Sequence, residues 1–137
     1  MGTKSRDYAG VNTVNNARVG NLPAARGKFL LLVDDIAYTC GTVEKIIRVM
    51  ADKEDIKGVV VVVSHALLSG NGVSVLDGLY KEGLLLNFIT TDSVPRRPEF
   101  ADAHPWYVEV SLSPRIARYV YSMYMDRSVS DVHLEDD

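Results

Sequence analysis

The sequence predicts an α/β protein whose mostly parallel sheet is covered by helices on both faces, a three-layer α/β/α arrangement. Two continuous apolar runs, Phe29–Val33 and Val59–Val63, are typical of strands buried on both faces. Segments with the periodicity of amphipathic helices follow these runs, and such alternation is typical of parallel sheets. With 137 residues, nearly half of them apolar, the chain is long enough for one domain with a substantial core.

The composition argues against several classes of function. Fifteen basic and eighteen acidic residues leave a formal net charge of −3, which argues against general nucleic-acid binding. The longest apolar runs are far too short to span a bilayer, and no apolar signal stretch is expected at the N-terminus. A single cysteine cannot form an internal disulfide, so we expect a reducing compartment, the cytoplasm. We therefore expect neither a nucleic-acid nor a membrane partner.

The first helix is expected to begin at Thr42, a residue type that caps helices well, because apolar residues then recur on one face from Val43 to Met50. Turn residues and apolar runs further along the chain predict a short helix and two more strands. These elements are expected at residues 73–80, 84–90 and 106–110. The prolines that precede the last strand predict a surface loop.

The last helix is expected to open at Ser113 and Pro114, a hydroxyl cap followed by a proline at the first helical position. Its apolar residues predict one buried side, formed by Leu112, Ile116, Tyr119, Val120 and Met123. We divide the chain into a polar lead-in at residues 1–27, one domain at residues 28–130 and an acidic tail at residues 131–137.

Two adjacent carboxylates, Asp34 and Asp35, follow the first buried strand and precede a short loop and a helix. The loop residues are small or carry hydroxyls: Thr39, Cys40, Gly41 and Thr42. Ligands of open parallel sheets bind at the carboxyl ends of the strands, where this segment is expected to lie. Amides at a helix N-terminus bind phosphate, and carboxylates accept hydrogen bonds from sugar hydroxyls. The segment therefore predicts a site for a phosphorylated pentose, with Mg²⁺ held near the carboxylates through the substrate.

An acid pair after a strand also occurs in polar loops and helix caps, so the pair alone does not decide the function. The order of strand, acid pair, loop of small residues and helix favours the sugar-phosphate hypothesis. Cys40 has two interpretations, a thiol made acidic by the nearby helix start or a small residue that the loop requires. We favour the second.

The segment Leu31–Thr42 resembles the signature of type I phosphoribosyltransferases, an acid pair followed by a loop of threonine and glycine. Its Thr-Cys-Gly-Thr sequence resembles more narrowly that of the ribose-phosphate pyrophosphokinases, also called phosphoribosyl pyrophosphate synthetases. Segments 64–70, 91–95 and 128–130 resemble further parts of this family, in the same order. The resemblance covers nearly the whole chain and corresponds to the C-terminal half of the family's enzymes.

This resemblance implies a type I phosphoribosyltransferase-like fold and transfer of diphosphate from MgATP to ribose 5-phosphate. The product is 5-phosphoribosyl 1-pyrophosphate, which serves nucleotide biosynthesis. By resemblance, Asp34 and Asp35 hold the ribose hydroxyls, and residues 39–42 cradle the 5-phosphate. Ser128 and Ser130 match a stretch that contributes to a regulatory nucleotide site between subunits. The family forms dimers that assemble into hexamers, so a homo-oligomer is implied.

Two features depart from the family's pattern. Tyr38 stands where the family usually has an acid, and the half that contacts ATP in the family has no counterpart in this sequence. We therefore expect no catalytic residue within this chain and no activity from the chain alone. A non-catalytic regulatory subunit of a synthetase and a nucleobase phosphoribosyltransferase are the alternatives.

Other polar residues near the predicted site have less specific patterns. His65 is interpreted as structural, with a supporting role beside the site as the alternative. Asp92 either approaches the ribose or caps a turn, and the sequence leaves this open. Arg96 and Arg97 are interpreted as solvated loop residues, and His104 as a surface residue.

Overall fold

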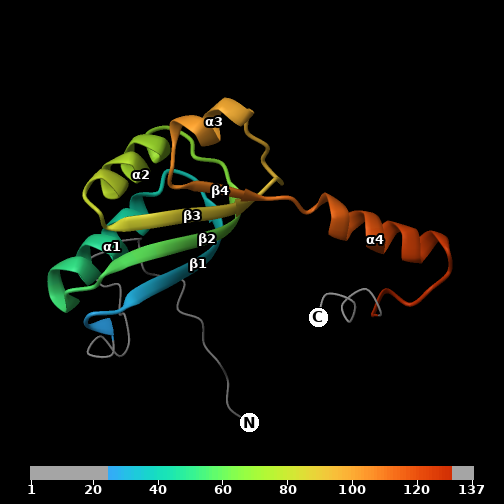
Figure 1. Cartoon of the computed structure of the whole chain (residues 1–137), viewed down its shortest axis with the longest axis horizontal. Helices are drawn as coiled ribbons and strands as arrows, with labels where there is room; N and C mark the ends of the chain where they lie inside the picture. Colours follow the sequence, from blue (N-terminus) through green and yellow to red (C-terminus); the bar gives the residue numbers. More distant parts are fainter. Residues whose placement is uncertain (1–24, 131–137) are drawn as a thin grey trace, which may run out of the picture.

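The computed structural model describes residues 25–130, in which strands and helices alternate (Figure 1). The elements, in chain order, are β1 (Phe29–Ala37), α1 (Gly41–Glu54), β2 (Gly58–Ala66), α2 (Gly72–Lys81), β3 (Leu85–Thr91), α3 (Pro98–Ala103), β4 (Tyr107–Val110) and α4 (Ser113–Tyr124). The predicted acidic tail and all but the last three residues of the predicted lead-in lie outside the described residues. The proposed domain division therefore stays a prediction.

The four strands form one parallel sheet with the order β1-β2-β3-β4, which confirms the predicted α/β class. The register pairs Val33 with Val62, and Ile89 with Val108. The first two strands extend several residues past the predicted apolar runs, to Ala37 and Ala66, because polar residues continue the ladder. Helix α3 lies where a proline-punctuated loop was predicted; Pro98 opens it, in a position where proline is tolerated.

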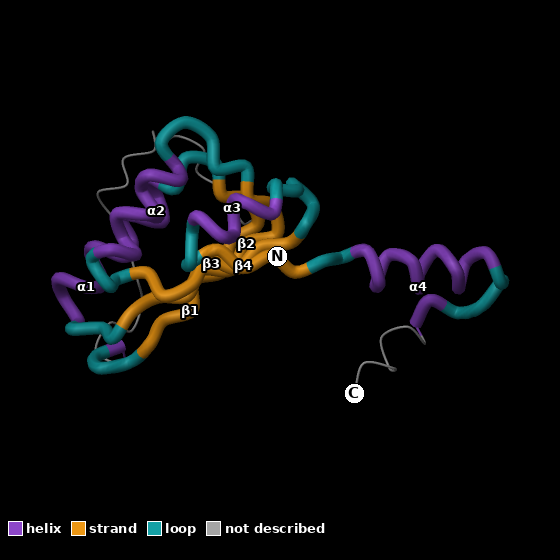
Figure 2. The backbone as a smooth tube through the Cα atoms, turned by 45° about the horizontal axis from the view of Figure 1, so that its top comes forward, coloured by secondary structure: helices purple, strands orange, loops and turns teal. Residues whose placement is uncertain are grey.

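The helices α1, α2 and α3 lie on the same side of the sheet (Figure 2). This follows from the strand order, because each strand pairs with the next in sequence and parallel crossovers are right-handed. Every crossover then turns toward the same face. Within residues 25–130, no helix covers the opposite face, so the second helical layer of the predicted three-layer arrangement is not formed by this part of the chain.

The core fills the space between the helices and the covered face of the sheet. Its members come from all three strand–helix units and pack as one cluster. The core residues with no measurable exposure are Ile47, Val61, Ala66, Leu76, Leu79, Phe88 and Trp106. Helices α1 and α2 contribute apolar residues at helical spacing, so burial of the covered face is the main apolar stabilisation of the fold.

The opposite side of the sheet, here called the open face, exposes apolar side chains. Leu31 and Val33 are 67% and 69% exposed, values unusual for central residues of an α/β strand. The register places further apolar residues of the other strands on the same side, some of them partly buried. The open face consists of Phe29, Leu31, Val33, Val60, Val62, Ile89, Val108 and Val110.

An aromatic cluster anchors α3 and β4 to α2. Asp77 accepts hydrogen bonds from Trp106 Nε1 at 2.7 Å and from His104 Nδ1 at 2.9 Å. Burial alone raises the pKa of Asp77, but the hydrogen bonds from Trp106 and His104 outweigh it, so this pKa lies below its ordinary value. The interpretation of His104 as a surface residue is wrong: the ring is largely buried and packs on Phe100. The partner that holds it, Asp77, is distant in sequence.

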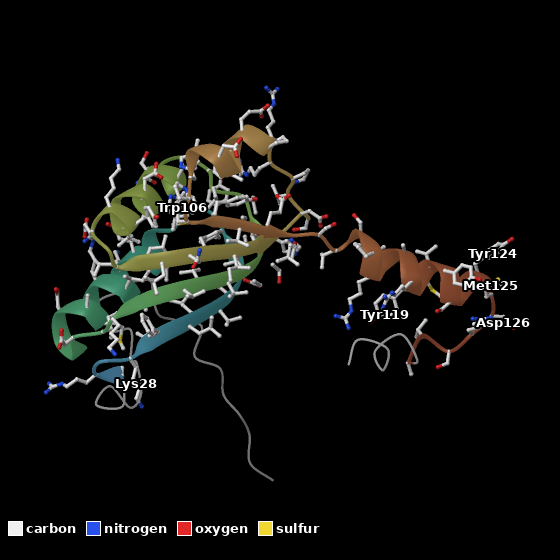
Figure 3. All side chains as sticks on the ribbon, in the orientation of Figure 1. Lys28, Trp106, Tyr119, Tyr124, Met125 and Asp126 are labelled. Atoms are coloured by element: carbon white, nitrogen blue, oxygen red, sulfur yellow. The ribbon has the colours of Figure 1, made fainter. Side chains whose placement is uncertain are left out.

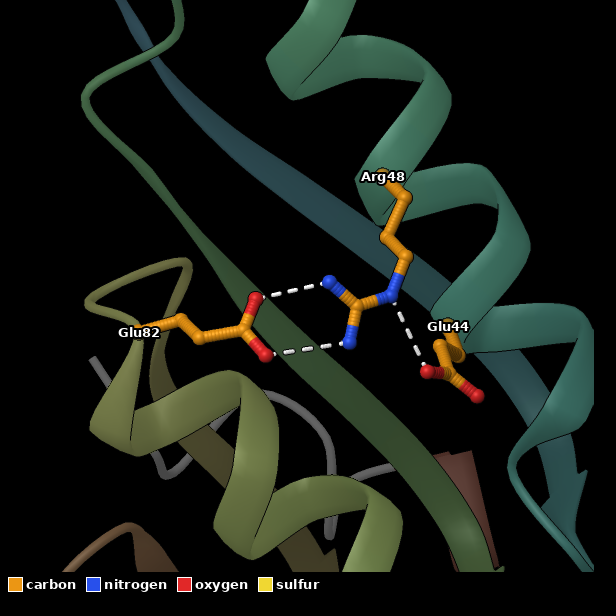
Figure 4. A network of polar contacts seen from close by, with 3 residues as sticks. All are labelled: Glu44, Arg48 and Glu82. Atoms are coloured by element: carbon orange, nitrogen blue, oxygen red, sulfur yellow. Dashed lines mark hydrogen bonds and ion pairs between the residues drawn. The ribbon is translucent and has the colours of Figure 1, made fainter.

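Arg48 joins α1 to the end of α2 (Figure 4). Its Nη1 and Nη2 donate hydrogen bonds to the two carboxylate oxygens of Glu82 at 2.7 and 3.1 Å, and Nε donates one to Glu44 at 3.0 Å. These bonds lower the pKa of Glu82 and raise that of Arg48. The paired geometry specifies how the two helices lie together, whereas exposed ion pairs contribute little to stability.

Helix α4 projects from the edge of the sheet instead of packing on the domain (Figure 3). None of its residues is buried, and Tyr124 is 84% exposed. The predicted buried side of this helix is therefore wrong, because helical periodicity identifies an apolar face but not what covers it. The helix starts at Ser113 with Leu112 as its N-cap residue, so the predicted Ser113 cap is wrong and Pro114 is the second helical residue instead of the first.

Asp92, just after β3, fixes the start of α4 through a set of hydrogen bonds that we call the Asp92 clamp. Its Oδ1 accepts a hydrogen bond from the Leu112 amide at 2.9 Å, and its Oδ2 accepts hydrogen bonds from the hydroxyls of Ser111 and, at 3.5 Å, Ser113. The Leu112 amide, with the Ser111 hydroxyl, holds the pKa of Asp92 below its ordinary value. Of the two roles that the sequence left open for Asp92, the structure shows the cap.

Replacing Phe88 by alanine is expected to lower the free energy of unfolding by about 3–5 kcal/mol, because the ring is fully buried. Trp106, whose ring lies edge-on to Phe88 at a centroid distance of 6.0 Å, is the only tryptophan of the chain. Its fluorescence therefore reports urea unfolding directly. Tyr124→Ala is the control, with an expected change within about 0.5 kcal/mol. Equal losses for the two variants would contradict the packing described.

Asp77 is expected to make the fold less stable in acid. Because its folded-state pKa is lowered, its carboxylate stabilises the fold above the unfolded-state pKa of about 4. This contribution is lost as the pH falls through the folded-state value. Urea unfolding from about pH 5 to pH 2 should show a smaller fall in stability for Asp77→Asn than for the wild type. Part of the fall should persist, since the pKa values of Glu82 and Asp92 are also lowered.

Candidate functional site

The acid pair lies at the carboxyl end of β1, the edge of the sheet where ligands of parallel α/β folds bind. Asp34 and Asp35 are both exposed. They belong to the strand, which continues to Ala37, whereas the sequence predicted that they follow it. Asp34 is in register with Val63, and the Asp35 amide donates a hydrogen bond to Asp34 Oδ1 at 2.9 Å. The pair is thus open to a ligand from solvent.

Successive side chains of a strand point to opposite faces, so the two carboxylates have different surroundings. Asp34 shares the side of Leu30 and Leu32, which pack against the core beneath the helices. Asp35 shares the side of Leu31 and Val33, on the open face. Asp34 is therefore the carboxylate on the side where α1 begins.

The loop between β1 and α1 reverses the chain at Cys40. This residue has a left-handed backbone, with φ 59° and ψ 9°, and is the N-cap residue of α1. Its carbonyl accepts a hydrogen bond from the Glu44 amide at 2.9 Å, the first of the helix. The prediction that Thr42 caps the helix is wrong, because the turn at Cys40 starts the helix at Gly41 and Thr42 falls within its first turn.

The first turn of α1 presents donors at the carboxyl edge of the sheet. The amides of Gly41, Thr42 and Val43 have no acceptor within the helix, as in every helical first turn. Thr39 and Thr42 are exposed and add hydroxyls beside these amides. Together with the positive end of the helix dipole, the donors favour an anion at this position. The predicted phosphate loop thus lies next to the acid pair.

Contacts from the turn after β2 support the loop. The Ala37 carbonyl accepts hydrogen bonds from the Leu67 and Leu68 amides at 2.9 and 3.1 Å, and the Tyr38 carbonyl accepts one from Ser69 at 2.8 Å. Gly72, at the start of α2, lies so close that a Cβ there would come within 3.1 Å of the Tyr38 carbonyl oxygen. The loop is therefore held by a neighbouring segment as well as by its own sequence.

The Cys40 thiol faces the interior. The residue is 4% exposed, and burial raises the pKa of its thiol from 9.0 to about 11. The alternative of an acidic thiol at a helix start is thereby contradicted, because desolvation dominates at this position. The favoured interpretation agrees with the structure, since a larger side chain would have to displace core residues.

A network of polar side chains joins the ends of β2 and β3. The hydroxyls of Thr91 and Ser93 donate hydrogen bonds to the Ser64 carbonyl at 2.7 and 2.9 Å, and His65 Nδ1 lies 2.7 Å from Ser93 Oγ. With the Ser93 proton directed at the carbonyl, the histidine ring is the donor to Ser93. This arrangement supports the structural interpretation of His65. Thr91 and Ser93 were not singled out from sequence, although hydroxyls at a strand end are a usable signal.

Arg96 braces the segment that supports the loop. Its Nη2 donates hydrogen bonds to the carbonyls of Ala66, at 2.8 Å, and Leu67. The interpretation of Arg96 as a solvated residue is wrong, since its position is set by carbonyls from a distant part of the sequence. Arg97 is exposed, as predicted.

Ser128 and Ser130 follow α4, at the end that is remote from the sheet (Figure 1). The Ser130 amide donates a hydrogen bond to Ser128 Oγ at 3.2 Å. Within this chain they are not brought to the acid pair. Their predicted role in a regulatory nucleotide site stays a prediction.

At the site, the acid pair supplies carboxylate oxygens of the kind that bind hard cations. No group of three or more histidine, cysteine, aspartate or glutamate side chains within residues 25–130 is placed to hold a metal ion. Exposed carboxylates fit Mg²⁺, which binds through one or two carboxylates and keeps waters or substrate oxygens as its other ligands. In the same residues, no helix has the length and apolarity needed to cross a membrane.

Comparisons with known proteins find similar sequences and one similar fold. No family model matches the chain. The chain is 31% identical over 132 residues to a ribose-phosphate pyrophosphokinase of Bifidobacterium longum, covering 94% of this chain and 35% of the relative. It is 28% identical over 131 residues to a ribose-phosphate pyrophosphokinase of Campylobacter jejuni, covering 96% of this chain and 38% of the relative. The chain is thus similar in sequence to ribose-phosphate pyrophosphokinases over nearly its whole length. It spans a little over a third of the length of these relatives.

The fold also matches that of a solved structure. The crystal structure of phosphoribosylpyrophosphate synthetase from Mycobacterium smegmatis matches with a TM-score of 0.63 and 20% sequence identity, over 74% of this chain and 32% of that one. At this identity the match bears on the fold, which is the predicted α/β fold. The resemblance inferred from the acid pair and its loop is confirmed by the relatives, and the predicted α/β class is confirmed by the fold.

Cys40 is expected to react slowly with a thiol reagent in the folded protein. A pKa of about 11 instead of 9.0 lowers the thiolate fraction at about pH 8 roughly 100-fold. Reaction with Ellman's reagent should therefore be at least about 100-fold slower in buffer than in urea. The chain has one cysteine, so the absorbance change reports this residue alone. Equal rates in the two solvents would contradict a buried sulfur.

Proposed function

We propose that this chain is the ribose 5-phosphate-binding part of a ribose-phosphate pyrophosphokinase. The observation that carries the proposal is the placement of an exposed acid pair beside the first turn of α1 at the carboxyl edge of the sheet. The homology to ribose-phosphate pyrophosphokinases supports the same assignment. In this proposal the amides of residues 39–42 bind the 5-phosphate, and the acid pair binds the ribose hydroxyls.

The proposed reaction transfers a diphosphoryl group from ATP to the sugar. The anomeric hydroxyl oxygen forms a bond to the β-phosphorus, the bond from that phosphorus to the α-phosphate oxygen breaks, and AMP leaves. Such transfer depends mainly on positioning and on neutralisation of charge. This chain contributes the positioning of the acceptor. Asp34 and Asp35 are the residues that would hold Mg²⁺, which would supply positive charge to the phosphate oxygens. Contacts to ATP come from the remainder of a full-length enzyme, so the chain alone binds the sugar without catalysis.

The two carboxylates are proposed to contribute unequally. Asp34 lies on the side of the strand from which α1 departs, and Asp35 lies on the open face. A sugar whose phosphate contacts the first turn of α1 extends over the side of Asp34. We therefore assign Asp34 the main hydrogen bonds to the ribose hydroxyls and Asp35 a smaller electrostatic role.

Further properties of the family are carried to this chain as part of the proposal. We place the enzyme in the cytoplasm and assign it a homo-oligomeric assembly, a dimer that builds a hexamer. Ser128 and Ser130 are proposed to contribute to a regulatory nucleotide site between subunits. The product, 5-phosphoribosyl 1-pyrophosphate, serves nucleotide biosynthesis.

One observation favours a second candidate function, a non-catalytic subunit that binds sugar phosphate for regulation. Tyr38 is 58% exposed beside the acid pair, at the position where the family usually has an acid. An aromatic side chain there adds bulk and removes a negative charge near the sugar. Under this alternative Tyr38→Asp strengthens binding of the sugar phosphate only in the presence of Mg²⁺.

Ribose 5-phosphate is expected to raise the melting temperature of the chain, because a ligand that binds only the folded state stabilises it by mass action. Asp34→Asn should weaken binding about tenfold or more, as expected for loss of a hydrogen bond to a charged group. Asp35→Asn should weaken it less. Isothermal titration calorimetry of each variant gives the dissociation constants.

The matched control is Asp52→Asn, which removes an exposed carboxylate from the far end of α1 and should leave binding unchanged. Titration with ribose alone measures binding at the acid pair, and titration with inorganic phosphate alone measures binding at the loop. If about millimolar ribose 5-phosphate gave no thermal shift while Trp106 fluorescence showed a folded protein, the assigned site would be wrong.

A further inference from the structure

The turn after β2, residues 66–69, which we call the support turn, holds the chain just before the candidate phosphate loop, residues 39–42. Two of its amides donate hydrogen bonds to the Ala37 carbonyl at 2.9 and 3.1 Å. The Ser69 amide donates one to the Tyr38 carbonyl at 2.8 Å. These two acceptors directly precede the loop in sequence. The position of the loop therefore depends on the shape of the support turn.

The support turn has a backbone that its own sequence does not favour. Leu68 has a φ of 50°, in the left-handed region that residues with a Cβ rarely adopt and that glycine adopts readily. A residue in this region keeps its conformation only where the surrounding structure imposes it. The turn therefore needs contacts from other elements to keep its shape.

Arg96, in the loop between β3 and α3, supplies such contacts. Its Nη2 donates hydrogen bonds to the Ala66 carbonyl at 2.8 Å and to the Leu67 carbonyl, which belong to the two residues before Leu68. Its guanidinium carbon Cζ lies 5.3 Å from the centroid of the Phe100 ring on α3. The side chain thus joins α3 to the first half of the support turn.

The position of Arg96 is unfavourable for stability alone. Its Nε is buried and has no hydrogen-bond partner among residues 25–130. A buried donor without an acceptor destabilises a fold, and nearly all buried polar groups of native proteins are paired. An unbranched apolar side chain would remove this unpaired donor and could still pack on Phe100. What the arginine adds over such a side chain is its pair of hydrogen bonds to the support turn.

We propose that Arg96 is a positioning residue for the candidate phosphate loop and that it thereby sets the affinity of the site for a sugar phosphate. Arg96 fixes two carbonyls of the support turn, the turn fixes the Ala37 and Tyr38 carbonyls, and the loop amides follow directly. This action passes through backbone hydrogen bonds and requires no contact between Arg96 and the ligand. The effect on affinity rests on the proposed function, whereas the effect on the loop does not.

Cys40 reports the state of the loop without a ligand, because its thiol is buried and must be exposed before a reagent reaches it. Arg96→Met removes the hydrogen bonds and keeps a long side chain beside Phe100. We expect Ellman's reagent to react with Cys40 of this variant at least about tenfold faster in buffer, as for loss of a hydrogen bond from a charged group in a local opening equilibrium. The urea midpoint of Trp106 fluorescence should change little, because removal of the unpaired Nε offsets the lost bonds.

Binding of ribose 5-phosphate is the second readout. Isothermal titration calorimetry should give a dissociation constant at least about tenfold higher for Arg96→Met than for the wild type, because a looser loop must be ordered on binding. Arg97→Met is the matched control. It removes the same charge from the adjacent residue, which is exposed, and should change neither the Cys40 rate nor the dissociation constant.

Arg96→Lys keeps the charge and a nitrogen donor at this position. It should therefore change both readouts less than Arg96→Met does, and a larger change would contradict the role of the hydrogen bonds. Should Arg96→Met fail to fold, the same comparison is made between Arg96→Lys and Arg97→Lys.

Four results would overturn the proposal. An unchanged Cys40 rate in Arg96→Met would show that the loop does not depend on Arg96. A faster reaction accompanied by a proportionate fall in the urea midpoint would show that Arg96 stabilises the whole fold and nothing more specific. Equal effects of Arg97→Met would indicate a general effect of charge. A faster reaction with an unchanged dissociation constant would show that the loop does not set the affinity.

Failure of the proposed function gives a different result. If the wild type did not bind ribose 5-phosphate while Arg96→Met still accelerated the reaction of Cys40, the proposed function would be wrong. The positioning of the loop by Arg96 would stand.

Discussion

The handedness of the strand connections determines most of this structure. Each strand pairs with its neighbour in sequence, so right-handed crossovers carry α1, α2 and α3 to one side of the sheet. The core lies on that side, and the loops after β1, β2 and β3 meet at the carboxyl edge. The same constraint leaves Leu31 and Val33 on a face that residues 25–130 do not cover. The site and the open face are therefore two results of one topology.

The candidate site depends on contacts that reach it from other elements. Arg96 holds the carbonyls of Ala66 and Leu67, and the turn that follows them donates hydrogen bonds to the loop at Ala37 and Tyr38. The loop residues therefore keep their arrangement without a ligand. Binding of a sugar phosphate at a site organised in this way requires little rearrangement, which reduces the entropic cost of binding.

Local patterns in the sequence predicted the strands, the position of the acid pair and the loop of small residues. The sequence could not show which other residues contact each predicted element or side chain. The apolar side of α4 was predicted correctly as apolar but wrongly as buried, since periodicity carries no information on what lies opposite. His104 and Arg96 were misjudged for a related reason: Asp77 and the Ala66 carbonyl, which hold them, are each about 30 residues away in sequence. Asp34 and Asp35 were treated as one pair because the extent of β1 was underestimated.

Gly72 lies against the Tyr38 carbonyl, although it opens a different helix. Any larger residue at this position would push that carbonyl by a few tenths of an ångström, and the shift would pass through Thr39 into the turn proposed to bind the phosphate. Evolution can therefore tune ligand affinity from a residue that no ligand touches. Searches for specificity determinants that weigh only ligand-lining positions would overlook it.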